Sequence, residues 1–112
     1  MSISISARVR PLLSEEKNNG ERLAWKTDKQ KKTLYFEEFE DSKRKRKDIM
    51  KEFSFSDVFD FDCSNQEIYN KLVKELVSTA IAGLSASFFV YGQTGSGKTY
   101  SISGGKLEEG VF

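Results

Sequence analysis

Apolar and polar residues alternate with a period of two near the N-terminus, which predicts a β-strand with one buried face. The apolar positions are Ile3, Ile5, Ala7 and Val9, and the residues between them are serines and arginines. Pro11 follows and cannot donate a hydrogen bond to a neighbouring strand, so we expect the strand to end there. Residues 14–21 are polar and contain the turn signal Asn19-Gly20.

Three short apolar stretches predict further strands. Residues 23–25 and 33–36 read as two strands of a small meander. Phe53 and Phe55 alternate with serines and lead into Val58-Phe59, which we interpret as one more strand over 53–59.

The best-defined helix begins at Ser64. Ser64 and Glu67 match a capping box, in which each side chain accepts a hydrogen bond from an exposed N–H group of the other residue. Apolar residues then recur on one helical face, which we interpret as core: Ile68, Tyr69, Leu72, Val73, Leu76, Val77, Ala80 and Ile81. Gly83 suits a left-handed cap at the C-terminal end of this helix.

A second apolar run, Ser87–Tyr91, reads as a buried strand and leads directly into a glycine-rich loop. A short helix is expected after the loop, ending at Gly104-Gly105. The order strand, loop, helix, preceded by a crossover helix, favours an α/β fold with a parallel central sheet.

The glycine-rich loop carries the clearest chemistry. It fits the pattern G-x-x-x-x-G-K-[ST] of phosphate-binding loops with Gly92, Gln93, Thr94, Gly95, Ser96, Gly97, Lys98 and Thr99. Its glycines let backbone N–H groups gather around an anion. Lys98 can reach β- and γ-phosphate oxygens, and the hydroxyl of Thr99 can bind Mg²⁺. A plain turn between strand and helix is the alternative, and the preceding apolar run favours the phosphate site.

Composition narrows the other possibilities. Eighteen basic and seventeen acidic residues leave a net charge of +1, so no overall field favours nucleic acid or an anionic membrane. No apolar run is long enough to span a membrane. With one cysteine and no histidine, the 112 residues cannot form an internal disulfide, a zinc cluster or a histidine-based triad. This inventory fits a reducing, cytoplasmic setting.

Four segments in order resemble the kinesin motor domain family. They are ISARVRPL at 5–12, FSFSDVFD at 53–60, QEIY at 66–69 and GLSASFFVYGQTGSGKTYSISGG at 83–105. The first ends in the R-x-R-P pattern of the opening kinesin strand, and the last contains the phosphate loop and the turn after it. Ser85 stands where kinesins usually carry Asn, and we expect this difference to leave the chemistry unchanged.

The resemblance implies a pocket for adenine. The residues that match the family's base-contacting positions are Arg8, Pro11 and Tyr100. A guanidinium plane, a proline ring and a phenol can each stack on a purine without reading its edges. For Arg10, a role in the pocket and a solvated strand face both remain open.

Five consecutive cations at Lys43–Lys47 have three interpretations. Neighbouring acidic residues favour a solvated loop tip. A nuclear-import patch and contact with the acidic surface of tubulin are the alternatives.

The resemblance implies an α/β fold, a P-loop NTPase of kinesin motor type, with an incomplete central β-sheet flanked by helices. Two later kinesin motifs around the nucleotide, resembling N-x-x-S-S-R and D-L-A-G-S-E, do not occur in residues 1–112. We therefore expect residues 1–112 to be the N-terminal third of a motor domain, truncated before both switch motifs and inactive by itself. The complete protein is expected to bind ATP and Mg²⁺ and to couple ATP hydrolysis to movement along microtubules, in the cytoplasm and on the cytoskeleton, without nucleic acid or membrane insertion.

Two other functional classes stay open. One is a non-catalytic module that binds a nucleotide or a protein partner. The other is a different P-loop NTPase, such as a small nucleotide kinase, which needs an acceptor-binding segment and a lid after the loop. Only thirteen residues follow Thr99, which leaves no room for either in this sequence.

Overall fold

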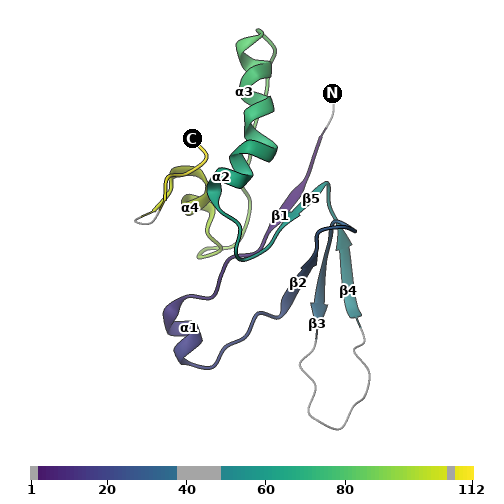
Figure 1. The fold of residues 1–112 in the computed structure, drawn as a ribbon, viewed down its shortest axis with the longest axis vertical. Helices are drawn as coiled ribbons and strands as arrows, with labels where there is room; N and C mark the ends of the chain where they lie inside the picture. The colour runs from purple at the N-terminus through teal and green to yellow at the C-terminus, as the bar shows by residue number, and fades with distance from the viewer. Residues whose placement is uncertain (1–2, 38–48, 106–107) are drawn as a thin grey trace. The chain divides into compact units, whose positions relative to one another are not determined.

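The computed structural model describes residues 3–37, 49–105 and 108–112. The chain comprises two compact units, Met1–Asp62 and Cys63–Phe112, whose elements are labelled in Figure 1. The basic run Lys43–Lys47 lies outside the described residues.

A two-stranded parallel sheet lies in the first unit. It pairs β1 (Ser6–Arg8) with β5 (Asp57–Phe59), and Ala7 stands opposite Val58. Val58 and Phe59 are buried, so this short ladder supplies part of the core. The predicted N-terminal strand is confirmed over these three residues, whereas Ile3 and Ile5 before it are exposed.

The predicted meander is present in this unit, but its first strand begins at Trp25 and shares only that residue with the predicted strand 23–25. It consists of β2 (Trp25–Asp28), β3 (Thr33–Glu37) and β4 (Ile49–Ser54), antiparallel and in that order. Trp25 packs across the sheet against Phe36 and Phe53, with ring centroids 5.4 and 6.1 Å apart. Such aromatic pairs on one sheet face stabilise the pairing of neighbouring strands.

The prediction of a single strand over 53–59 is wrong, because the two ends of this stretch belong to different sheets. The N–H of Phe55 donates to the carbonyl of Lys32 at 2.9 Å, next to the meander. The N–H of Ser56 donates to the carbonyl of Ile5 at 2.8 Å, beside β1. The backbone thus changes its hydrogen-bonding partner between two adjacent residues, and β4 and β5 are separate strands.

Residues 14–21, for which only a turn was expected, contain the short helix α1 (Ser14–Asn18). The carboxylate of Glu16 accepts the N–H of Leu13 at 2.8 Å and so stabilises the first turn. Both terminal nitrogens of Arg10 donate hydrogen bonds to the same carboxylate, at 2.8 and 3.0 Å. This two-point contact, followed by the Leu13 hydrogen bond, lowers the pKa of Glu16 from its ordinary value.

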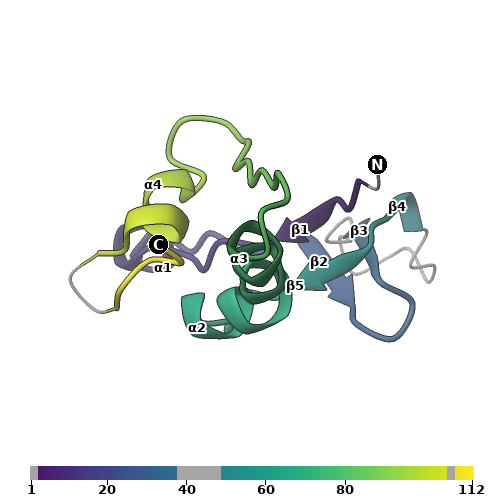
Figure 2. The same cartoon turned by 90° about the horizontal axis from the view of Figure 1, so that it is seen from above.

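One continuous helical rod opens the second unit (Figure 1). It runs through α2 (Asn65–Ile68), the π-helical turn η1 (Tyr69–Val73) and α3 (Lys74–Ile81). Ser64 caps its start, and its hydroxyl accepts the N–H of Glu67 at 3.2 Å, as predicted. Figure 2 shows the rod nearly end-on.

The C-terminal end of the rod follows the expected geometry. Gly83 adopts φ +89°, and its N–H donates to the carbonyl of Ala80 at 3.0 Å. The N–H of Leu84 donates to the carbonyl of Thr79 at 3.2 Å. This pair of bonds is a Schellman motif, which confirms the predicted cap.

The apolar stripe is buried only along part of the rod. Ile68 is 4% exposed and Val73 is fully buried, whereas Ile81 is 82% exposed. The prediction that the whole stripe is core is therefore confirmed for Ile68 and Val73 and wrong for Ala80 and Ile81, while the other four residues are half-buried.

The strand predicted at Ser87–Tyr91 is also wrong, since this segment joins no β-ladder among the described residues. Phe88 and Val90 are half-buried, while Phe89 and Tyr91 are 87% and 101% exposed. A strand needs a neighbouring backbone to pair with, and the described residues do not supply one here. The predicted short helix is present as α4 (Lys98–Ser103).

Candidate functional site

The loop Gly92–Thr99 forms a tight turn that passes directly into α4. Gly95 and Gly97 have φ of +81° and +97°, conformations that residues with a side chain rarely adopt. The N–H of Ser96 donates to the carbonyl of Gln93 at 3.1 Å and closes the turn between Gln93 and Ser96. Because α4 begins at Lys98, the first-turn N–H groups of that helix have no carbonyl partner inside it.

The side chain of Lys98 folds back over the loop. Its Nζ donates to the carbonyl oxygen of Gly92 at 2.6 Å, so the lysine bridges the two ends of the loop. A Cβ on Gly92 would lie 2.5 Å from the Oγ of Ser96, which means that the space at this position depends on glycine. An ammonium has three donors, and this contact uses one of them.

These features fit a nucleotide phosphate group. The loop combines two left-handed glycines, a helix start and a half-buried ammonium with donors to spare. Thr99 is exposed at the end of the loop, where its hydroxyl can serve as one oxygen ligand for Mg²⁺. The part of the chain that the structure describes contains no group of three His, Cys, Asp or Glu side chains that could hold a metal ion without phosphate ligands.

Tyr100, the third predicted base-contacting residue, takes part in a polar network that the sequence did not indicate. Its hydroxyl donates to Oε1 of Glu108 at 2.7 Å. The backbone N–H of Asn65 reaches the same carboxylate at 3.2 and 3.3 Å. Nδ2 of Asn65 donates to the carbonyls of Tyr100 and Glu109, both at 2.9 Å. Asn65 is only 1% exposed, so its amide is a buried connection between α2, α4 and the segment after α4.

The segment after α4 folds back on that helix. Gly104 forms an isolated antiparallel bridge with Glu109, and the N–H of Val111 donates to the carbonyl of Ser101 at 2.9 Å. This return brings Glu108 to the start of α2, where negative charge is favourable next to exposed N–H groups.

The other two predicted base contacts, Arg8 and Pro11, lie in the first unit. Arg8 is half-buried at the end of β1, and Pro11 is exposed. Arg10 is held by Glu16 through its bidentate ion pair, at 2.8 Å for the shorter contact, so the structure gives this residue a role in anchoring α1.

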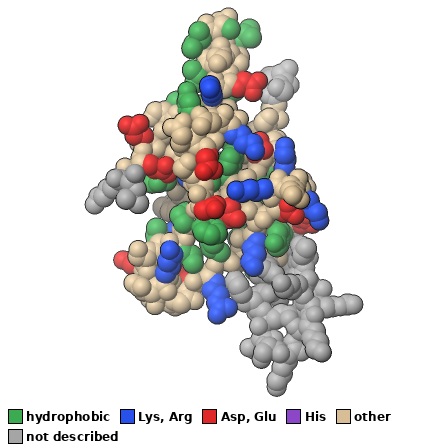
Figure 3. Space-filling view, viewed as in Figure 1, with side chains coloured by type: hydrophobic (Ala, Val, Ile, Leu, Met, Phe, Trp, Pro, Cys, Tyr) green, Lys and Arg blue, Asp and Glu red, His purple; other side chains and the backbone are tan. Residues whose placement is uncertain are grey.

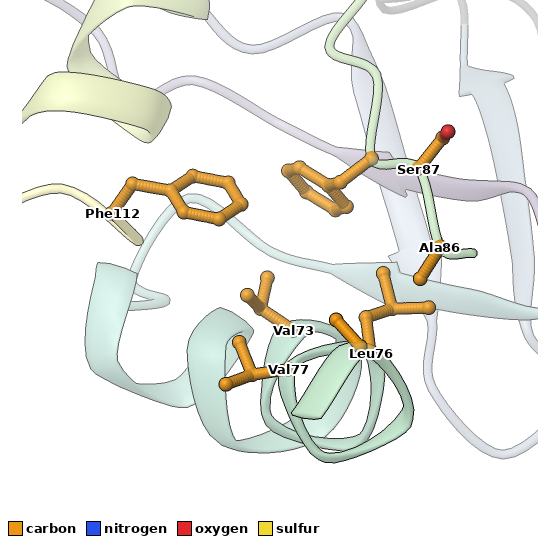
Figure 4. A pocket seen from close by; sticks show the side chains of 8 residues that line it. Val73, Leu76, Val77, Ala86, Ser87 and Phe112 are labelled. Atoms are coloured by element: carbon orange, nitrogen blue, oxygen red, sulfur yellow. The ribbon is translucent and has the colours of Figure 1, made fainter. Parts of the chain in front are cut away.

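An apolar pocket of about 120 Å³ lies along the rod (Figure 4). Val73, Leu76 and Val77 line it from the helix, and Ala86 and Phe112 line it from segments that run beside the helix. The rings of Phe88 and Phe112 lie 5.9 Å apart at its edge. It lacks charged groups, and we assign it no nucleotide role.

Charged side chains of both signs are interspersed over the described residues on the face shown in Figure 3. This distribution agrees with the small net charge of the chain. Across residues 3–37, 49–105 and 108–112, no helix has the length and apolar character needed to cross a bilayer.

Comparison with known proteins finds similarity to a family model and to curated relatives over most of the chain. The family model for the kinesin motor domain matches residues 8–112. The chain is 34% identical to kinesin-like protein KIN-7C of rice, covering 91% of this chain and 11% of that protein. It is 33% identical to human centromere-associated protein E, covering 99% of this chain and 4% of the relative. The chain is 34% identical to human kinesin-like protein KIF19, covering 98% of this chain and 11% of that protein. The chain therefore spans only a small part of the length of these relatives.

Proposed function

Since the chain belongs to the kinesin motor domain family, we propose that its residues form the ATP-binding part of a microtubule-based motor. The observation that carries the proposal is the loop Gly92–Thr99, where Lys98 lies over the loop and α4 begins directly behind it. In the complete protein, ATP hydrolysis is coupled to movement along microtubules in the cytoplasm. Tubulin is the macromolecular partner.

The residues have distinct roles in this proposal. ATP supplies the phosphoanhydride bond to be broken, and Mg²⁺ neutralises charge on the phosphates. Lys98 binds β- and γ-phosphate oxygens with the donors that its contact to Gly92 leaves available. Thr99 contributes its hydroxyl to Mg²⁺. Arg8, Pro11 and Tyr100 provide flat surfaces for the adenine.

Residues 1–112 constitute the N-terminal third of the motor domain in this proposal. The two compact units then belong to one α/β domain with an incomplete central sheet. The family model matches residues 8–112, and the chain covers only 11% of the length of KIN-7C. The groups that position the attacking water belong to the remaining part of the domain.

ATP turnover by the complete protein, measured with and without microtubules, tests the proposal. We expect microtubules to raise the rate, and Lys98→Ala to reduce the stimulated rate below about a tenth of wild type, because the charge on the γ-phosphate site is lost. Lys74→Ala is a matched control, since Lys74 is an exposed lysine on α3 outside the loop. Retention of more than about a tenth of the rate in Lys98→Ala would show that the loop is wrongly assigned.

A non-catalytic binding fragment is the second candidate. The exposed apolar residues after the rod favour it, since Leu84, Phe89 and Tyr91 are 66%, 87% and 101% exposed. Several large apolar side chains exposed within one short segment are typical of a surface that another polypeptide covers. Microtubule-stimulated turnover by the complete protein separates the two candidates, because a binding module has none.

A further inference from the structure

Tyr100 is connected to the start of the long helical rod through one carboxylate. Glu108 accepts the Tyr100 hydroxyl at 2.7 Å with Oε1, and both of its oxygens lie within 3.3 Å of the Asn65 backbone nitrogen. Asn65 itself is buried and binds the carbonyl of Tyr100 at 2.9 Å through its side chain. The tyrosine is thus fixed at its backbone and at the far end of its ring by the same small network.

The ring is also confined at its side. A Cβ on Gly105 would lie 2.9 and 3.0 Å from Cδ2 and Cε2 of Tyr100, so the backbone of Gly105 packs closely against the ring. Tyr100 as a whole residue remains partly exposed despite these contacts. Its orientation is therefore set by the protein, while part of its surface stays available to a ligand.

We infer that Glu108 is a positioning residue for the nucleotide base: it holds the Tyr100 ring in one orientation before ATP binds. The inference rests on the proposed function, in which Tyr100 stacks on adenine. Ordering a mobile side chain on binding weakens affinity, and a ring already held in place avoids that loss. In this proposal Glu108 affects the base through Tyr100, so its removal weakens contact with the base, whereas the phosphate contacts of Gly92–Thr99 stay in place.

Three variants of the full-length protein test this assignment, with MgATP and tripolyphosphate as probes. We expect Glu108→Ala to bind MgATP roughly three- to tenfold more weakly and to keep the wild-type affinity for tripolyphosphate. Glu108→Gln restores MgATP affinity, because its amide oxygen can still accept the Tyr100 hydroxyl. Glu109→Ala is the matched control. The residue lies next to Glu108 and is exposed, and only its backbone carbonyl belongs to the network.

Tyr100→Phe provides an independent measurement, because it removes the hydroxyl but keeps the stacking ring. Tyr100→Phe breaks only the Tyr100–Glu108 hydrogen bond, whereas Glu108→Ala also removes the contact to the Asn65 N–H. We expect Tyr100→Phe to weaken MgATP binding, and the double variant to show no loss beyond that of Glu108→Ala, since that variant already lacks the Tyr100–Glu108 contact. Additive losses, equal weakening of both probes, or wild-type MgATP affinity in Glu108→Ala would each overturn the inference. If wild type binds neither probe, the proposed function fails before the role of Glu108 is reached.

Discussion

At the scale of single residues, Tyr100 has two roles: it takes part in the hydrogen-bond network of the second unit, and we propose that it stacks on the adenine. We expect Tyr100→Ala to weaken ATP binding by about 1–3 kcal/mol, the usual contribution of one base–aromatic stack. The triphosphate contacts come from Gly92–Thr99 and are unchanged, so tripolyphosphate should compete equally well with ATP-site probes in both proteins. Calorimetric titration of wild type and variant with each ligand gives the comparison. Equal ATP affinity in the two proteins would remove Tyr100 from the site.

A second residue-scale prediction concerns Glu16 and pH. Its pKa is lowered in the folded protein, chiefly by the side-chain hydrogen bonds from Arg10. A lowered folded-state pKa means that the ion pair stabilises the fold above the ordinary value of 4.5, and that this stability is lost as pH falls through the lower folded-state value. Arg10, whose pKa is raised, stays charged throughout this range.

The measurement is the unfolding midpoint of the complete protein, as wild type and as Glu16→Gln, from neutral pH to pH values below 4.5. We expect wild type to be more stable at neutral pH and the difference to vanish in acid. Glu15→Gln is the matched control, because Glu15 is exposed in the same helical turn. A gap between wild type and Glu16→Gln that did not change with pH would contradict the assignment.

At the scale of elements, the π-helical turn lies in the part of the rod where the apolar stripe is most buried. The two most buried apolar residues of the rod, Ile68 and Val73, are five positions apart, which matches the i to i+5 spacing of a π turn. An apolar stripe read with the α-helical period cannot reveal such a turn. The sequence therefore indicated the helix, its cap and its end, but not which residues of the stripe face the core.

Substitutions at the two isoleucines of the rod test this view of the core. Ile68→Ala should lower the free energy of unfolding by about 2–5 kcal/mol, since Ile68 is only 4% exposed and its truncation leaves a cavity in the core. Ile81→Ala makes the same chemical change at a site that is 82% exposed, and should stay within about 0.5 kcal/mol of wild type. Chemical denaturation of both variants gives the two values. Similar losses in both variants would mean that Ile81 is covered in solution.

Other elements show why local patterns were not sufficient. The segment Ser87–Tyr91 has the composition of a strand, yet a strand exists only with a paired neighbour, and pairing is not encoded locally. The helix α1 was not predicted, because Leu13 at its N-terminus is not a typical capping residue and the ion pair to Arg10 comes from outside the helix. Its only local signal was the pair of acidic residues in its first turn, Glu15 and Glu16.

At the scale of the whole chain, local and distant contacts differ in how well they could be predicted. The loop Gly92–Thr99 was recognisable because all its chemistry lies within eight consecutive residues. The network around Asn65 was not, since its contacts join residues 35 to 44 positions apart. A buried asparagine directly after a helix cap gives no hint in the sequence of which carbonyls it binds.

Exposed apolar residues lead to a prediction for residues 1–112 expressed alone. Phe89, Tyr91 and Phe112 are 87%, 101% and 70% exposed, which favours association between molecules. We expect this polypeptide to be poorly soluble or loosely packed, to bind ATP weakly and to show no microtubule-stimulated hydrolysis. Size-exclusion chromatography, thermal unfolding and ATP titration provide the measurements. A monodisperse monomer with a cooperative transition and micromolar ATP affinity would disprove this expectation.

The π-helical turn η1 also affects how this chain should be aligned with its relatives. A π turn holds one residue more than the α-helical turn that it replaces, while the flanking helical segments continue on either side. A relative that is one residue shorter between Ser64 and Gly83 can therefore keep the same cap, the same Schellman motif and the same number of turns. The alignment gap for such a relative belongs within Tyr69–Val73, inside the helix, and not in the loops where gaps are usually placed.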